Sequence, residues 1–132
     1  MSSYLNLFLK TKSKENKESE YLFFMSFSRN SEIYQHLDEE IPNLYCSNGE
    51  IKKKISIDSV NNIIKELNNE IQKNTSMYHI YKDCKDAESA LTVKNYIRDL
   101  NDTLCKFEFI NLILIESSFD HCDFEGLYGY ID

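Results

Sequence analysis

The chain is poor in residues that interrupt regular structure: it contains one proline and three glycines among 132 residues, and no tryptophan. So few breaks favour long helices and strands. Three glycines are also too few for a phosphate-binding loop, and neither GxxxxGK[ST] nor GxGxxG occurs. The hydrophobic fraction of 42%, with 13% aromatic residues, argues against a disordered chain. We therefore expect a compact domain, rich in helix, without a nucleotide-binding loop.

Cysteine pairs and a secretory signal are also missing. Residues 1–10 lack the basic start and the small-residue cleavage site of a signal peptide. The cysteines lie far apart and form no CxxC pair: Cys46, Cys84, Cys105 and Cys122. We expect a reducing cytoplasm, in which the cysteines serve as small core residues.

No pattern of catalytic or metal-binding residues stands out. His121, Cys122, Asp123 and Glu125 form the one local cluster of potential ligands. Structural zinc needs about four ligands, usually paired two to four residues apart, and this cluster lacks that spacing. No glycine-flanked nucleophile marks a pair of cysteine and histidine. We expect no enzyme activity, no metal and no cofactor.

The first part of the chain alternates as β-strands do. Residues 4–9 place three leucines on one side, and residues 21–28 repeat the pattern with Phe23 and Met25 on a common face. Residues 10–20 between them carry no apolar side chain, which predicts a mobile, charged loop.

A short helix and a second hairpin are expected next. Residues 31–41 favour a helix that Pro42 ends. Asn48-Gly49 is typical of the tight turn of a β-hairpin, here between residues 44–47 and 50–57.

Apolar side chains then recur at helical spacing over residues 58–117, with one break around residues 84–86. This pattern predicts two long antiparallel helices. Ser56 or Asp58 can cap the first helix and Asp86 the second, because their oxygens can accept from the unpaired amides of a first turn.

Two stretches of this hairpin differ from the rest. The apolar stripe weakens at residues 74–76, where a kink or fraying is expected. Residues 107–115 are apolar nearly all round, which indicates either the centre of the core or a subunit interface.

The expected fold class is α+β: a small N-terminal antiparallel sheet with one short helix, packed on a long C-terminal antiparallel helical hairpin. We expect residues 1–132 to form one domain. Its parts are a β-rich half at residues 1–57, the hairpin at residues 58–118, and an acidic tail at residues 119–132 that packs its aromatic side chains on the helices.

The net charge of −7 comes from residues 83–132, which hold eleven acids against four bases. An acidic surface repels nucleic acid and suits a basic protein partner, while simple solubility is the alternative. Tyrosines near the hairpin tip and in the tail suit a contact surface. The candidate partner contacts are Asp99, Asp102, Asp120, Asp123, Glu125, Tyr78, Tyr81, Tyr128 and Tyr130.

A basic set offers a different function. Together with nearby tyrosines, Arg29, Lys52, Lys53 and Lys54 could hold a small anionic ligand, such as a signalling nucleotide, between the subunits of an oligomer. A homodimer built through the helical hairpin is the expected oligomer in that case, and solubilising lysines are the plain alternative.

Four segments resemble small phage and prophage proteins of low-GC Gram-positive hosts: residues 3–6 (SYLN), 26–34 (SFSRNSEIY), 48–49 (NG) and 130–132 (YID). The resemblance implies a non-enzymatic phage protein that binds and inhibits a host factor in the host cytoplasm. A defence component such as a CRISPR nuclease is the partner it suggests, and a phage structural or accessory role is a further alternative.

Overall fold

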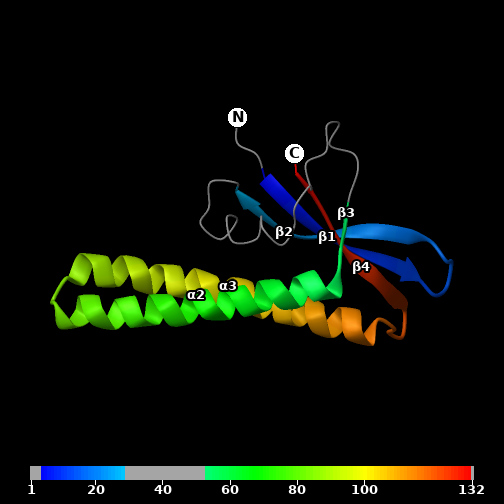
Figure 1. Cartoon of the computed structure of the whole chain (residues 1–132). Helices are drawn as coiled ribbons and strands as arrows, with labels where there is room; N and C mark the ends of the chain where they lie inside the picture. Colours follow the sequence, from blue (N-terminus) through cyan, green and yellow to red (C-terminus); the bar gives the residue numbers. More distant parts are fainter. Residues whose placement is uncertain (1–3, 29–52, 132) are drawn as a thin grey trace.

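The computed structural model describes residues 4–28 and 53–131. Its elements are β1 (Tyr4–Ser13), β2 (Ser19–Ser28), β3 (Lys53–Ile55), α2 (Ile57–Asp83), α3 (Ala87–Glu116) and β4 (Cys122–Ile131). The strands form one antiparallel sheet in the order β2-β1-β4-β3. This sheet lies against one end of the α2–α3 hairpin, and the rest of the hairpin projects beyond it (Figure 1). The predicted α+β class is confirmed. The predicted short helix and the Asn48-Gly49 turn lie outside the described residues.

The two helices of the hairpin begin and end where the sequence predicts. Ser56 caps α2, because its Oγ accepts from the backbone N–H of Ser59 at 3.0 Å. Asp86 caps α3 in the same way, through the N–H of Ser89 at 3.1 Å. Between the helices, Lys85 adopts the left-handed conformation with φ 60°, which ends α2 and turns the chain back.

The expected kink or fraying at residues 74–76 is wrong, since α2 continues through them. Their polar side chains bond to carbonyl groups one turn earlier in the same helix. Asn74 Nδ2 donates to the Glu70 carbonyl at 2.7 Å, and Thr75 Oγ1 donates to the Ile71 carbonyl at 2.7 Å. These groups therefore do not need water, and the helix tolerates them.

The loop expected at residues 10–20 is mostly strand. β1 extends to Ser13 and β2 begins at Ser19, so the turn covers only residues 14–18. The N–H of Lys17 donates to the Ser13 carbonyl at 3.0 Å, and the N–H of Ser13 donates to the Glu18 carbonyl at 2.9 Å. Pairing with two neighbouring strands holds this polar part of β1 in extended form.

The C-terminal segment is the larger correction. Residues expected to form a tail on the helices instead form β4, which lies between β1 and β3. Leu127 of β4 faces Leu9 on one side and Ile55 on the other, and all three side chains are buried. The sheet therefore joins the two ends of the described chain.

A bulge in β2 reverses part of its predicted pattern. Leu7 faces Met25 but Phe8 faces Phe23, so Phe24 is the extra residue. Phe23 therefore lies on the opposite face of the sheet from Met25 and contacts Phe8 edge-on, with ring centroids 5.7 Å apart. The predicted common face of Phe23 and Met25 is wrong for this reason.

The core lies where the sheet covers α2 and α3. Leu5, Leu7 and Leu9 of β1 pack there with Phe107 and Ile110 of α3. One face of α3, which we call the buried seam, packs on this core and on α2, with Leu100, Leu104 and Leu114 among its buried members. Among the described residues, no helix combines the length and apolar character needed to span a membrane.

Candidate functional site: an apolar groove with an acidic rim

A hollow of about 600 Å³ lies where α3 ends and the chain turns into β4. Its lining combines apolar side chains, two acids and a histidine. The lining residues are Phe109, Leu112, Ile113, Glu116, Phe119, Asp120, His121, Cys122 and Phe124. We call this hollow the acidic groove.

The turn after α3 builds one wall of the acidic groove. Ser117 adopts the left-handed conformation with φ 56°, which ends the helix. The N–H of Phe124 then donates to the Ser117 carbonyl at 2.7 Å, and the N–H of Phe119 donates to the Cys122 carbonyl at 3.0 Å. This folded turn brings the rings of Phe119 and Phe124 together edge-on, with centroids 5.2 Å apart.

The other wall is the exposed half of the apolar stretch in α3. Phe107, Ile110, Ile113 and Leu114 are buried, whereas Phe109, Leu112 and Ile115 are 56%, 60% and 62% exposed. Single exposed apolar residues are ordinary, but successive turns of one helix form a patch. The core interpretation of residues 107–115 is therefore confirmed for one face of the helix, and the opposite face is exposed.

The rim of the acidic groove carries negative charge that no ion pair within residues 4–28 and 53–131 neutralises. Glu116 and Asp120 are exposed. Neither forms an ion pair with any lysine or arginine in the part of the chain that the structure describes. A ligand that fits this groove would combine apolar surface with positive charge.

The five predicted acidic contacts do not form one surface. Asp120 lies in the acidic groove, whereas Asp99 and Asp102 are exposed further back on α3. Asp123 pairs with Lys14 at 3.7 Å, and Glu125 pairs with Lys10 at 3.4 Å.

The bulge between β1 and β4 explains the position of Glu125. Lys10 faces Gly126 and Thr11 faces Phe124, so Glu125 is the extra residue. Its hydrogen bond and its negative charge raise the pKa of Lys10. Glu125 is therefore already engaged within the chain and is less suited to bind a partner than Asp120.

The predicted tyrosine contacts lie in two distant places. Tyr78 and Tyr81 are half-buried near the hairpin tip, where Lys82 Nζ lies 6.0 Å from the centroid of the Tyr78 ring. Tyr128 and Tyr130 belong to β4, on the face of the sheet away from the helices. Figure 1 shows the tip and the sheet at opposite ends of the hairpin.

Tyr128 contributes to an aromatic arrangement on that sheet face. Its ring meets the ring of Tyr21 edge-on at 5.5 Å, and Lys10 Nζ lies 5.9 Å from both ring centroids. The ring centroids of Tyr130 and Phe8 lie 6.1 Å apart. These contacts lie within the sheet, so the tyrosine pair is part of the packed fold.

The basic set is only partly described. Arg29 and Lys52 lie outside the described residues, and of Lys53 only the backbone pairing in β3 is described. Lys54 is exposed and pairs with Tyr128 across β3 and β4. A separate hollow of about 430 Å³ at the hairpin tip holds three other lysines, Lys82, Lys85 and Lys94, beside Tyr78.

Within residues 4–28 and 53–131, no three histidine, cysteine or acidic side chains come together as metal ligands. No protein-family model matches the chain, and no curated protein or solved structure does either. The acidic groove therefore has to be interpreted from its own chemistry. Sequence reasoning missed most of its residues, although the all-round apolar pattern of residues 107–115 indicated an exposed side.

Proposed function

We propose that this chain is a non-enzymatic binding protein that inhibits a host factor by docking on a basic, partly apolar segment of it. The supporting observation is the acidic groove, which offers exposed Phe109 and Leu112 beside Glu116 and Asp120, two acids without an ion pair to any described residue. Apolar contact supplies binding energy, while the acids favour basic partners and repel acidic ones.

The proposed partner is a host defence component such as a CRISPR nuclease, whose nucleic-acid-binding surface is basic. The resemblance to phage and prophage proteins supports this choice, and so does the position of the charge excess in residues 83–132. Occupying such a surface would compete with the guide or target nucleic acid of the nuclease.

Calorimetry with purified candidate nucleases, at low and high salt, tests the proposal. Asp120→Lys should lower affinity roughly tenfold, because it replaces an attraction with a repulsion. Glu66→Lys is the matched control, since Glu66 is exposed on α2 away from the acidic groove, and it should change little. Equal effects of the two variants would contradict docking at the groove.

Apolar docking has its own test. Leu112→Glu should weaken binding at both salt concentrations, because an added carboxylate prevents dry contact with the groove wall. Binding that survives Leu112→Glu and does not respond to salt would show that the partner uses another surface.

The alternative, an oligomer that sequesters a small anion, has one observation in its favour. Lys82, Lys85 and Lys94 line the hollow at the hairpin tip. Titration with inorganic phosphate, followed by NMR, should shift the amide signals of residues 82–94 if this function applies. Unchanged signals at millimolar phosphate would contradict it.

A further inference from the structure

The outward face of α3 changes character along its length. It lies opposite the buried seam and consists of exposed side chains three or four residues apart. These are Leu91, Lys94, Arg98, Asn101, Cys105, Phe109, Leu112 and Glu116. The half near the tip is basic, and the half near the sheet is apolar and ends in an acid. When two copies of this face lie antiparallel, the basic half of one copy meets the apolar and acidic half of the other.

We propose that this face is the interface of an antiparallel homodimer, with a two-fold axis at Cys105. About such an axis, residues of the outward face that lie equally far before and after Cys105 come to the same level in the two copies. Lys94 and Glu116 are each eleven positions from Cys105, so each pairs with the other in the second copy. Arg98 and Leu112 are each seven positions away, and the Arg98 stem covers the exposed Leu112 side chain.

The flanks of the face agree with this register. Asp102 and Lys106 lie one turn apart, both exposed, on the flank next to the outward face. In the antiparallel register Asp102 of one copy lies beside Lys106 of the other. Glu108, on the opposite flank, lies beside Asn101 of the second copy, so no like charges meet there. A parallel dimer would instead place Lys94 against Lys94 and Glu116 against Glu116.

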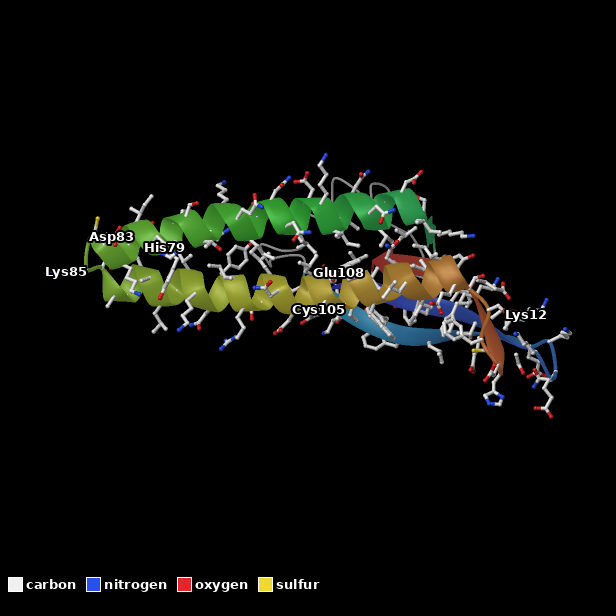
Figure 2. The ribbon with its side chains drawn as sticks, turned by 90° about the horizontal axis from the view of Figure 1, so that it is seen from below. Lys12, His79, Asp83, Lys85, Cys105 and Glu108 are labelled. Carbon is white, nitrogen blue, oxygen red and sulfur yellow. The ribbon has the colours of Figure 1, made fainter. Side chains whose placement is uncertain are left out.

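The second copy supplies what the acidic groove lacks. Leu91, Lys94 and Arg98 form a short segment that is both apolar and basic, and Leu91 is 59% exposed in the single chain. Covering Phe109 and Leu112 removes two large exposed apolar side chains of α3 from water. Figure 2 shows Cys105 on α3, between the hairpin tip at Lys85 and the sheet-covered end.

This inference does not rest on the proposed host partner. Since Phe109, Leu112 and Glu116 line the acidic groove as well, a second copy and a docking partner would compete for it. The dimer can be tested on the chain alone, so its failure would leave the proposed function standing.

Charge reversal gives the first test, with light scattering after size exclusion as the measurement. The unaltered chain should have twice the 15.6 kDa mass of one copy. Lys94→Glu and Glu116→Lys should each give a monomer, and the double variant should again give a dimer. Circular dichroism checks that each variant is folded. A monomeric unaltered chain, dimeric single variants or a monomeric double variant would overturn the proposal.

Cross-linking at the axis gives the second test. A chain whose other three cysteines are replaced by serine should form a covalent dimer when oxidised glutathione accepts electrons from two Cys105 thiols. The matched control keeps only Cys84, which is exposed at the hairpin tip and should stay monomeric. Cross-linking through Cys84 in place of Cys105 would overturn this register.

Discussion

At the scale of single residues, Phe107 carries the contact between α3 and the sheet. Its side chain is fully buried, while Phe109 of the same helix is 56% exposed. Phe107→Ala should therefore lower the free energy of unfolding by about 3–5 kcal/mol through lost burial and a remaining cavity. Urea unfolding of a dilute sample measures this change in the free energy of unfolding. Phe109→Ala is the control and should cost less than about 1 kcal/mol; equal losses would contradict the orientation of α3.

Asn111 is the residue that fits its surroundings least. It lies between the buried Phe107 and Leu114 on one face of α3, and its Oδ1 is buried without a hydrogen-bond donor among the described residues. An unsatisfied buried acceptor costs about 1–3 kcal/mol. Asn111→Leu should therefore raise the free energy of unfolding by roughly 1 kcal/mol in the same urea experiment. A loss of stability would show that Asn111 has a partner that its present surroundings do not reveal.

At the scale of elements, the cap of α3 makes hairpin stability depend on pH. The hydrogen bonds from the backbone and side chain of Ser89 lower the pKa of Asp86 below its ordinary value of 3.8. The folded chain therefore binds this proton less readily than the unfolded chain. The stabilisation is complete above pH 3.8 and is lost as the pH falls through the folded pKa.

Two substitutions distinguish the effect of the Asp86 charge from the effect of its capping hydrogen bond. Asp86→Asn keeps an oxygen acceptor, so it should retain most of the cap. It should lose the part of the pH dependence of stability that comes from titration of Asp86. Asp86→Ala should lower the melting temperature at neutral pH as well. Thermal unfolding followed by circular dichroism between pH 3 and 7 checks both, and an unchanged acid profile in Asp86→Asn would contradict the assignment.

The helices could be predicted from the sequence because each depends on a local pattern. Side chains three and four residues apart meet on one face, and Ser56 and Asp86 mark the helix starts. The sheet depends on pairing between distant segments. The extra residues Phe24 and Glu125 each reverse the alternation within a strand, and β4 is recognisable only once β1 and β3 lie beside it.

At the scale of the whole molecule, the candidate site could likewise be predicted from the sequence only in part. Of the five acidic contacts predicted from the charge excess, only Asp120 lines the acidic groove, and its second acid, Glu116, was not among them. Glu125 instead pairs with Lys10 of β1, and Asp123 pairs with Lys14 in the turn that follows β1; no spacing in the sequence indicates either pair. The groove depends on the left-handed conformation of Ser117. A serine in a sequence seldom predicts that conformation.

The projecting half of the hairpin should be the less stable half. Near the sheet, residues 100–110 of α3 pack on both α2 and the strands, whereas near the tip the buried side chains are Asn74, Ala90 and Val93 between the helices alone. Local opening costs less where less apolar surface is buried. Amides of residues 76–82 and 91–95 should therefore exchange hydrogen at least about tenfold faster than those of residues 100–110. Both sets have helical backbone hydrogen bonds, so the comparison isolates packing. Equal protection along the hairpin, measured by NMR, would mean that something besides the sheet stabilises the tip.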